Sequence, residues 1–510
     1  MRSATQDRIR TLEEVCSATE VLKRTGNIIV HCHGTFDLLH VGHIRHFEQA
    51  KSLGDVLVVT VTPDRYVNKG PHRPAFTEDL RAEAIAALDC VDYVAMNRWP
   101  TAVETIRLLK PDVYAKGLEY VDHQRDLTGK IVEEETAVKS VGGKIAFTDD
   151  IVFSSSSLIN RYLPMFPKEV REYLSAFSAR YSVDDVLQYL KNARSLKVLA
   201  VGETIIDDYQ YCEQMGKSAK EPILVSRCLS SEKFAGGILA VANHVANFCD
   251  EVGVLTTVGA NDSQEDFVRR NINSRVNKMF LYKANSPTIV KRRFVENYLM
   301  QKLFEVCEIN DEELDRTQTQ TLCAMLDEVI NKYDVVIVTD YGHGMLTKDA
   351  INMLCSKAHF LAVNTQVNAA NRGFNTISKY PRADYVSLAH HEIELEERNQ
   401  KRDLRGMILN VSQKLACGHI VVTQGTGGNV CYSEDEGFVE VPAFAHQVID
   451  RVGAGDAVLS LTALCVAQRA PIEIVGFIGN VVGAQAVATV GHRTSIEPVS
   501  LSKHIESLLK

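Results

Sequence analysis

Hydrophobic and polar positions alternate along the first 160 residues in a way that predicts strands and helices in turn. Short apolar runs at 27–31, 55–62 and 112–116 have the length of buried strands. Apolar residues at helical spacing lie between them, as at 44–53 and 78–88. A chain that repeats strand, helix and strand predicts a parallel sheet covered by helices.

The same alternation starts again near residue 197 and continues for about 300 residues. Buried-strand runs occur at 197–202, 335–339 and 419–423. The segments 221–226 and 288–306 carry additional strand patterns, which predict a small lid sheet on the second domain.

Between the two blocks, the pattern changes to charged amphipathic helix, with prolines as breakers at its start. We therefore expect four parts: an N-terminal extension at 1–26, a first domain at 27–162, a helical linker at 163–195 and a second domain at 196–510. The expected fold class is α/β, with two doubly wound parallel-sheet domains.

Composition narrows the class of protein. The chain has 510 residues and a net charge of −9, which disfavours nucleic acid and anionic membranes as partners. No apolar run reaches the roughly 18 residues of a membrane span, and the first residues have no signal-peptide pattern. The 12 cysteines form no C-x-x-C pair, which argues against a zinc ribbon or a disulfide framework. We expect a cytoplasmic protein whose phosphate ligands are met by local sites.

The first string with chemical potential is Gly-Thr-Phe-Asp-Leu-Leu-His-Val-Gly-His at 34–43, directly after a predicted strand. His40 and His43 are three residues apart at a helix start, and Gly42 permits close approach of a ligand. Two imidazoles placed there suit donation to the α-phosphate oxygens of a nucleoside triphosphate. Incidental histidines in a turn are the alternative interpretation, and a zinc site lacks further ligands at matched spacing.

The whole string resembles the H-x-G-H signature of the cytidylyltransferase-like nucleotidyltransferases, over roughly residues 27–160. The resemblance implies a Rossmann-like domain with His40 and His43 as catalytic residues. The further positions that match this family's nucleotide and phosphate contacts are Gly34, Thr35, Phe36, Lys69, Arg73, Lys116, Ser155 and Ser156. For each basic residue, a solvated surface charge is the alternative interpretation.

Two similarities of the first domain point to different nucleotides as its substrate. Residues 34–37 are similar to those of enzymes that use CTP, but Ile-Val-Phe-Ser-Ser-Ser-Ser at 151–157 replaces their R-T-x-G-I-S-T signature. The remainder of the domain looks more like the ATP-using heptose 1-phosphate enzymes. We expect ATP as the second nucleoside triphosphate, with CTP as the alternative.

The second string is Asp-Arg-Val-Gly-Ala-Gly-Asp at 450–456, before a long apolar helix. Small residues at 453–455 allow successive backbone N–H groups to converge on an anion at the helix N-terminus. Asp456 is then placed to take the proton from an attacking sugar hydroxyl. A helix-capping aspartate is the alternative interpretation.

This string resembles the G-A-G-D motif of the ribokinase-like (PfkB) carbohydrate kinases, and the similarity covers roughly 196–500. It implies Asp456 as catalytic base. The implied phosphate and nucleotide contacts are Thr423, Gly425, Gly453, Ala454 and Gly455, and the implied sugar contacts are Asp207, Gly236, Gly237 and Asn243. Lys291 and Arg293 are candidates for a distal phosphate of the sugar, and exposed strand charges are the alternative.

The chain departs from this kinase family at one point. Where the family has N-x-x-E, which helps to organise Mg²⁺ through water, this chain has Ala389-His390-His391-Glu392. Glu392 is the implied metal residue and Mg²⁺ the implied cofactor of both reactions. Loss of the amide puts metal affinity or full kinase activity in doubt.

Together the two domains resemble a bifunctional heptose 7-phosphate kinase/heptose 1-phosphate nucleotidyltransferase with the domain order reversed. The expected function is phosphorylation of a sugar or sugar phosphate at the anomeric hydroxyl by ATP, followed by nucleotidyl transfer to make an activated sugar for glycan synthesis. The family also implies a homodimer through the kinase lid. Two alternatives stay open: one domain, more readily the kinase-like one, is a noncatalytic binding module, or the domains act on unrelated metabolites such as a polyol phosphate.

Overall fold

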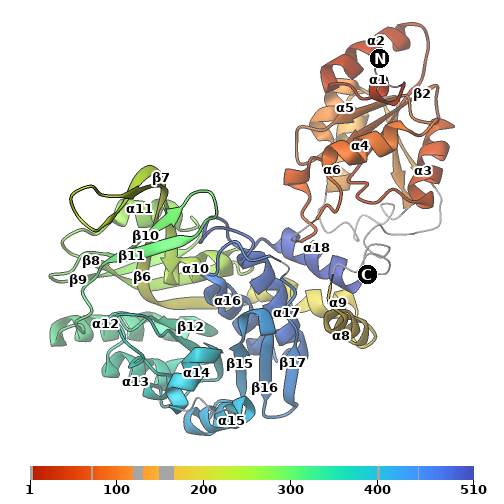
Figure 1. Cartoon of the computed structure of the whole chain (residues 1–510). Helices are drawn as coiled ribbons and strands as arrows, with labels where there is room; N and C mark the ends of the chain where they lie inside the picture. The colour runs from red at the N-terminus through yellow and green to blue at the C-terminus, as the bar shows by residue number, and fades with distance from the viewer. Residues whose placement is uncertain (1–3, 71–72, 119–129, 149–165, 399–402, 446) are drawn as a thin grey trace. The chain divides into compact units, whose positions relative to one another are not determined.

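A computed structural model of the chain describes the 510 residues except 1–3, 71–72, 119–129, 149–165, 399–402 and 446. Contacts divide the chain into two compact units. Unit 1 comprises residues 1–167 together with 502–510, and unit 2 comprises residues 168–501. Each unit is an α/β fold (Figure 1).

Unit 1 is built on a five-stranded parallel sheet in the order β3-β2-β1-β4-β5. The helices α3 and α4 pack on one face of this sheet, while α2, α5 and α6 pack on the other. All six side chains of β2 are buried, because both faces are covered. The described elements of the unit in chain order are α1 (Ala4–Arg8), α2 (Leu12–Arg24), β1 (Ile29–Gly34), α3 (Val41–Lys51), β2 (Val56–Val61), η1 (Asp64–Tyr66), α4 (Glu78–Ala86), β3 (Tyr93–Met96), α5 (Val103–Leu109), β4 (Val113–Gly117), α6 (Lys130–Ser140) and β5 (Lys144–Thr148).

Unit 2 has a 12-stranded sheet whose main path is β11-β10-β6-β12-β13-β14-β15-β16-β17, with β7, β8 and β9 attached to it. The helices α12, α13 and α15 pack on one face of its parallel part, and α10, α16 and α17 on the other. Its elements up to residue 308 are α8 (Lys168–Ser178), α9 (Val183–Asn192), η4 (Ala193–Ser195), β6 (Lys197–Lys217), β7 (Leu224–Gly237), α10 (Ile238–Ala246), β8 (Glu251–Gly259), α11 (Glu265–Asn271), β9 (Asn277–Lys283), β10 (Ile289–Glu296) and β11 (Lys302–Glu308). The remaining elements are α12 (Arg316–Val329), η5 (Ile330–Lys332), β12 (Val335–Asp340), α13 (Lys348–Lys357), β13 (Leu361–Thr365), η6 (Ile377–Lys379), β14 (Tyr385–Ala389), α14 (His390–Glu397), α15 (Leu404–Leu415), β15 (His419–Thr423), η7 (Gly425–Gly427), β16 (Asn429–Ser433), β17 (Gly437–Val441), α16 (Ala454–Ala467), α17 (Ile472–Ala486) and α18 (Pro498–Leu509), which ends in unit 1.

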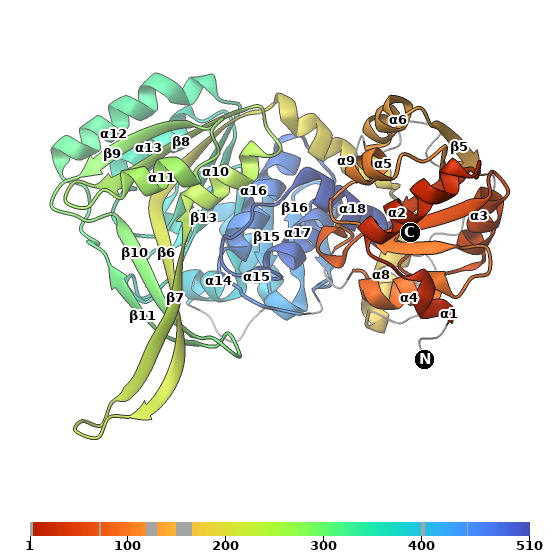
Figure 2. The same ribbon diagram turned by 90° about the horizontal axis from the view of Figure 1, so that it is seen from above.

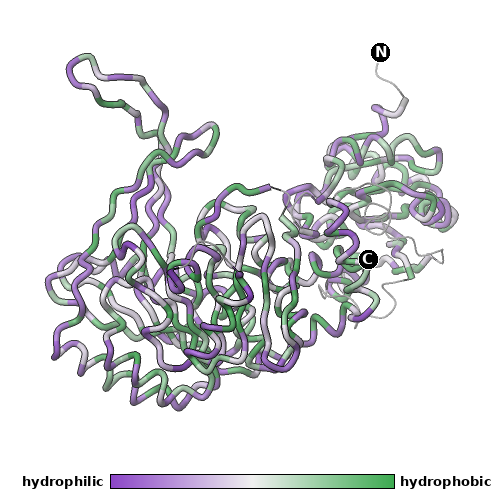
Figure 3. Tube along the Cα trace, turned by 60° about the horizontal axis from the view of Figure 1, so that its bottom comes forward, coloured by the Kyte–Doolittle hydropathy of each residue, from purple (hydrophilic) through white to green (hydrophobic). Residues whose placement is uncertain are grey.

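The long strand β6 takes part in two layers. Its first residues, 197–203, pair with β8 and β12 in the parallel core, and its later residues pair with β7 and β10 in a lid. Figure 2 shows the β6–β7 hairpin projecting far from the body of the unit. Both hydrophobic and hydrophilic stretches follow this arm, which is coloured by hydropathy in Figure 3.

The structure differs from the sequence-based prediction in how it divides the lid and the units. The stretch 288–306, expected to carry lid strands, forms two antiparallel strands, β10 and β11, and β7 starts later and runs longer than the expected 221–226. The helices α8 and α9, expected in a linker, fall in unit 2, and residues 502–510 fall in unit 1. Helix α8 packs through Phe177, whose ring stacks on Phe477 at 4.3 Å, so an apolar face joins it to the kinase-like core.

Among the described residues, no helix is both long and apolar enough to cross a membrane.

Candidate active sites

The histidine turn of unit 1 lies between β1 and α3. His40 is the N-cap of α3, and its Nδ1 accepts a hydrogen bond from the Gly42 N–H at 3.2 Å. Acceptance at Nδ1 leaves the proton on Nε2, so the ring presents an N–H donor. The rings of His40 and His43 stack with centroids 3.9 Å apart. The structure therefore brings together the two histidines that the sequence singled out.

His43 is held as a neutral ring. Burial, reinforced by the nearby charges of His40, His46 and Lys69, lowers its pKa to about 3. Its edge contacts Phe36 at a centroid distance of 5.2 Å, so the Phe36 backbone, held at a φ of +50°, places an apolar wall against the imidazole. A neutral imidazole donates a hydrogen bond to phosphate without bringing a charge of its own.

Two residues that the sequence analysis gave no role hold this turn in place. Asp37 is 2% exposed and accepts hydrogen bonds from the backbone N–H groups of Ala75, at 2.6 Å, and Phe76, at 3.2 Å. Arg81, also 2% exposed, donates to the carbonyl oxygens of Thr35 and Thr62. The available sequence signal for this role was an arginine among the apolar positions of helix α4, because a buried charge needs several hydrogen-bond partners.

The basic candidates of unit 1 differ in their surroundings. The Arg73 guanidinium pairs with Asp37 at 3.2 Å, and the Lys116 ammonium pairs with the buried Glu134 at 2.9 Å. For Lys69, burial is the main cause that lowers the pKa, to about 8, and the charge of Asp37 opposes it. Phosphate contact by these three residues stays a prediction, and Lys69 is the one without a carboxylate ion pair among the described residues.

Gly34 and Thr35 lie at the end of β1, where a Cβ on Gly34 would meet the Phe36 ring at 2.8 Å. Thus Gly34 is required by the close approach of Phe36. Ser155 and Ser156 lie outside the described residues.

In unit 2, Asp456 lies in the first turn of α16 and is 7% exposed. Its Oδ1 accepts a hydrogen bond from the Tyr341 hydroxyl at 2.7 Å, and burial raises its pKa. Gly453, the N-cap, has a φ of +79°, and a Cβ on Gly455 would meet no atom within 4 Å. The backbone at Ala454 and Gly455 therefore forms an open helix N-terminus beside a buried carboxylate, as phosphoryl transfer requires.

His492, which the sequence analysis did not single out, joins the two glycine motifs. A Cβ on Gly453 would meet its ring at 2.0 Å and one on Gly236 at 3.4 Å. Its Nε2 lies 3.6 Å from Asp207 Oδ2. The motif around Gly236 and the motif before Asp456 therefore face one another, although more than 200 residues separate them in the sequence. Nothing in the pattern around His492 distinguishes it from a surface histidine.

Asp207 is positioned by its neighbours on the lid strands. It is 3% exposed and forms an ion pair with Arg293, which also pairs with Glu305 at 2.7 Å. A Cβ on Gly236 would lie 2.1 Å from the Asp207 carboxylate, so only glycine permits this approach. Arg293 is thus engaged with carboxylates of the protein.

Lys291 has different surroundings. It is 8% exposed, its ammonium lies 5.9 Å from the centre of the Tyr341 ring, and no described carboxylate pairs with it.

The two other candidates for sugar contact, Gly237 and Asn243, have structural roles of their own. Gly237, with a φ of +59°, is the N-cap of α10. The Asn243 amide binds the backbone of Asn271 and Asn273, at 2.9 and 2.8 Å, so both ends of the amide hold a loop.

Asp450 organises the loop before Asp456, a role the sequence did not reveal. Its carboxylate accepts hydrogen bonds from the Tyr209 hydroxyl at 2.6 Å and the Gly491 N–H at 3.0 Å, and it pairs with Lys302 at 2.5 Å. Burial raises the pKa of Asp450, but hydrogen bonds from Lys302, Tyr209 and the Val452 N–H, together with the Lys302 charge, outweigh it, so the pKa is lowered.

Glu392 lies at the start of α14 and is 6% exposed. Its carboxylate accepts the Ala389 N–H at 2.7 Å and the Val367 N–H at 3.2 Å. Burial raises its pKa to about 7, and the charge of Asp456 adds to this effect. Two buried carboxylates with raised pKa values fit Mg²⁺, which binds through one or two carboxylates and the phosphates of a nucleotide. No group of three or more metal-ligating side chains occurs within the described part of the chain.

The remaining nucleotide candidates follow strand β15. Thr423 is the register partner of Ala389, so it lies beside the start of α14. Gly425 has a φ of +59°, and a Cβ there would meet no atom within 4 Å. An open backbone at this point leaves room for a ligand.

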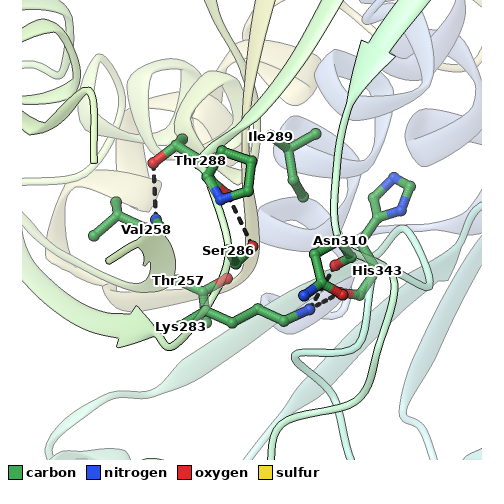
Figure 4. A pocket seen from close by; sticks show the side chains of 10 residues that line it. Thr257, Val258, Lys283, Ser286, Thr288, Ile289, Asn310 and His343 are labelled. Atoms are coloured by element: carbon green, nitrogen blue, oxygen red, sulfur yellow. Dashed lines mark hydrogen bonds between the residues drawn. The ribbon is translucent and has the colours of Figure 1, made fainter. Parts of the chain in front are cut away.

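A small hollow, with room for little more than a water molecule, lies at the ends of β8 and β9 and is lined among others by Thr288 and His343 (Figure 4). The Lys283 ammonium donates to the carbonyl oxygens of Asn310, Glu312 and His343 and so ties two loops together. The Nδ1 of His343 lies 2.6 Å from Asp311, and its Nε2 is buried without a hydrogen bond in the described structure.

Two family models match the chain, one over each of the two α/β parts. Residues 195–498 match the model of the pfkB family carbohydrate kinases, and residues 31–175 match that of the cytidylyltransferase-like family. The first match covers more than half of the chain, which therefore belongs to the pfkB family of carbohydrate kinases. Both families predicted from the motifs are confirmed.

Several similar proteins carry the name Bifunctional protein HldE. That of Syntrophotalea carbinolica is 36% identical over 162 residues, 31% of this chain and 32% of that protein. That of Aliarcobacter butzleri is 40% identical over 146 residues, 28% of this chain and 30% of that protein. That of Campylobacter jejuni is 26% identical over 311 residues, 60% of this chain and 64% of that protein. The chain thus spans about a third of the length of the first two relatives.

Among solved structures, phosphofructokinase-2 of Escherichia coli in complex with potassium is similar, with a TM-score of 0.49, 14% identity and coverage of 62% of this chain and 99% of that one. Ribokinase of Arabidopsis thaliana complexed with ribose and ATP has a TM-score of 0.46 at 14% identity, covering 62% of this chain and 99% of that one.

Proposed function

We propose that the chain is a bifunctional enzyme that first phosphorylates a sugar phosphate at its anomeric hydroxyl with ATP. It then transfers a nucleotidyl group from ATP or CTP to the sugar 1-phosphate, releasing pyrophosphate. The observation that supports the proposal is a pair of site geometries: the buried carboxylate of Asp456 beside an open helix N-terminus, and the stacked rings of His40 and His43, the second held neutral, at the start of α3. A cytoplasmic location follows from this proposal, because nucleoside triphosphates are the substrates.

In the kinase step, the sugar hydroxyl oxygen attacks the γ-phosphorus and the bond from that phosphorus to the β-phosphate oxygen breaks. Asp456 accepts the hydroxyl proton, and the hydrogen bond from Tyr341 at 2.7 Å fixes its carboxylate. The open N–H groups at Ala454 and Gly455 stabilise the charge on the transferred phosphoryl oxygens. Mg²⁺, when bound beside Glu392, neutralises charge on the nucleotide phosphates.

In the second step, a phosphate oxygen of the sugar 1-phosphate attacks the α-phosphorus of the nucleoside triphosphate and pyrophosphate leaves. His40 and His43 donate hydrogen bonds to the α-phosphate oxygens, where charge increases in the transition state. Because both rings are held by neighbouring groups, these donors need little reorganisation. Lys69 supplies positive charge for the departing pyrophosphate.

Lys291 and His343 support a phosphorylated sugar as substrate. A buried ammonium without an anion and a buried imidazole nitrogen without a partner are both unfavourable in the unliganded fold. The charge of Lys291, after burial, lowers the pKa of His343, which shows that the two groups are near each other. A phosphate at the far end of the sugar satisfies both groups at once.

To test the substrate class, we compare Lys291→Gln with Lys217→Gln, an exposed lysine on the lid. We expect the first change to raise KM for a sugar phosphate about tenfold to a hundredfold, while the weak rate on the unphosphorylated sugar stays the same. Equal losses on both sugars would contradict a phosphate contact at Lys291.

Single substitutions should strongly reduce one of the two reactions and leave the other intact. We expect Asp456→Asn to reduce phosphorylation about 100-fold to 10,000-fold while leaving transfer to a supplied sugar 1-phosphate intact. His43→Ala should give the reverse, so that the sugar bisphosphate accumulates, with transfer reduced roughly 100-fold. Products are identified by mass after incubation with a panel of sugar phosphates and all four nucleoside triphosphates, and Asp435→Asn, an exposed aspartate, is the control.

A result in which phosphorylation persists in Asp456→Asn would refute its role as base. Absence of kinase activity in the unchanged chain with every sugar would favour a noncatalytic C-terminal domain, since Ala389 replaces the amide expected there. We also propose a homodimer through the lid, whose outer strands expose Phe304, 56% accessible, and Val306, 44% accessible.

A further inference from the structure

The end of helix α18 packs within unit 1 against the loop that carries Lys69. Residues 502–510 belong to that unit, although the rest of unit 1 ends at residue 167. A Cβ on Gly70 would meet the His504 ring at 2.3 Å, so the ring lies directly on the Gly70 backbone. Gly70 also has a φ of +97°, and glycine is required there for both reasons.

This segment is docked by buried side chains. His504 is 4% exposed, Ile505 0% and Leu508 7%. Ser507 is 7% exposed as well. The four buried residues lie within about one and a half helical turns and line one broad face of the helix, which is the face that docks.

The same segment brings positive charge close to Lys69. Lys503 lies in α18 and Lys510 directly follows its last residue, Leu509, where its ammonium pairs with Glu506 at 2.5 Å. After burial and the opposing effect of Asp37, the charge of Lys510 is the largest cause that lowers the pKa of Lys69, and Lys503 contributes further. Lys69 in turn lowers the pKa of His43. Lys503 and Lys510 are thus electrostatic neighbours of Lys69, itself a neighbour of the proposed catalytic histidine, His43.

We propose that residues 502–510 are part of the nucleotidyltransferase site and that Lys503 and Lys510, with Lys69, bind the polyphosphate of the nucleoside triphosphate. The proposal rests on the proposed function of unit 1 and extends it to a segment that follows the kinase domain in sequence. The charges of Lys503 and Lys510 disfavour the protonated form of Lys69 in the free protein, and a polyanion bound beside these groups relieves that repulsion.

The decisive variant is Lys503→Gln with Lys510→Gln, which removes two charges and retains the apolar docking side chains. We expect KM for the nucleoside triphosphate in nucleotidyl transfer to rise about tenfold, and its increase with salt concentration to become less steep. KM for the sugar 1-phosphate and the kinase rate should not change. Lys503→Arg with Lys510→Arg should retain the low KM, because the positive charge remains.

The matched control is Lys139→Gln with Lys144→Gln, two exposed lysines of unit 1 near the opposite edge of its sheet. Hydrogen exchange provides a readout that does not depend on turnover: a non-hydrolysable nucleoside triphosphate should slow exchange in both 64–70 and 502–510. Slowing in 64–70 alone, with KM unchanged in the Lys503→Gln/Lys510→Gln variant, would overturn this inference and leave the proposed function standing. Slowing in neither segment with any nucleoside triphosphate would overturn both.

Discussion

At the scale of single residues, Lys69 gives the nucleotidyltransferase a measurable pH dependence. Its lowered pKa of about 8 means that the ammonium loses its proton near physiological pH, far below the ordinary lysine value. Positive charge at Lys69 is therefore present below pH 8 and lost above it. We expect kcat/KM for the nucleoside triphosphate to fall up to tenfold per pH unit above about 8.

Lys69→Arg should move this fall to higher pH, because a guanidinium stays charged throughout the accessible range. The measurement is a pH profile of nucleotidyl transfer from pH 6.5 to 9.5, with kinase activity of the same variant as the internal control. Superimposable profiles for the two proteins would contradict the role of Lys69.

The candidate catalytic residues could be proposed from the sequence where a motif concentrated them, as at His40, His43 and Asp456. The residues that hold these candidates in place could not be predicted from the sequence, because their roles depend on partners that are distant along the chain. Arg81 binds carbonyl oxygens of two loops, and His492 meets glycines that no local pattern connects with it. Asn243 matched by spacing, yet its amide binds a loop, since spacing does not report where a helix face points.

At the scale of elements, the start of α14 controls the expected response to metal. The Ala389 N–H already binds Glu392, whose pKa of about 7 leaves it partly protonated at neutral pH. We expect Ala389→Asn to lower the Mg²⁺ concentration needed for half-maximal phosphorylation severalfold, because an added amide oxygen helps to organise water around the ion.

The Mg²⁺ concentration needed for half-maximal phosphorylation should also fall as pH rises through 7, because Glu392 loses its proton there and becomes a better partner for a cation. Kinase rates titrated with Mg²⁺ at pH 6, 7 and 8 measure both effects, and nucleotidyl transfer by the variant serves as the control. Equal midpoints for wild type and Ala389→Asn would mean that the amide has no part in metal binding.

Elements of the parallel cores were predictable because buried strands and amphipathic helices leave strong periodic signals, as at β2 and β12. The lid was less predictable. Strand β6 runs for 21 residues through two layers, so its first half is buried on both faces and its far end is exposed. Because this one strand lies in two environments, its hydrophobic residues do not follow one periodicity along its whole length.

At the scale of the whole molecule, the proposed association of two copies depends on the outer lid face. The rings of Phe294 and Phe304 stack there at 4.5 Å, which extends the apolar area around Phe304. We expect Phe304→Asp with Val306→Asp to convert a dimer to a monomer, because burying two carboxylates at an apolar interface is unfavourable. Light scattering after size-exclusion chromatography measures the mass.

Phe374→Asp, a change at a side chain 86% exposed elsewhere in unit 2, is the control and should leave the mass unaltered. A monomer for the unchanged chain at micromolar concentration would contradict the dimer.

The contact between Gly70 and His504 also has a consequence for the order in which the protein is made. Unit 1 is discontinuous: about 330 residues of unit 2 lie between its main part and residues 502–510. A ribosome adding about 5–20 residues per second needs tens of seconds to cross that interval. During this time the Lys69 loop exists without the His504 ring that covers Gly70, so a nascent chain can close the β-sheet of unit 1 early and yet complete this contact only after unit 2 has emerged.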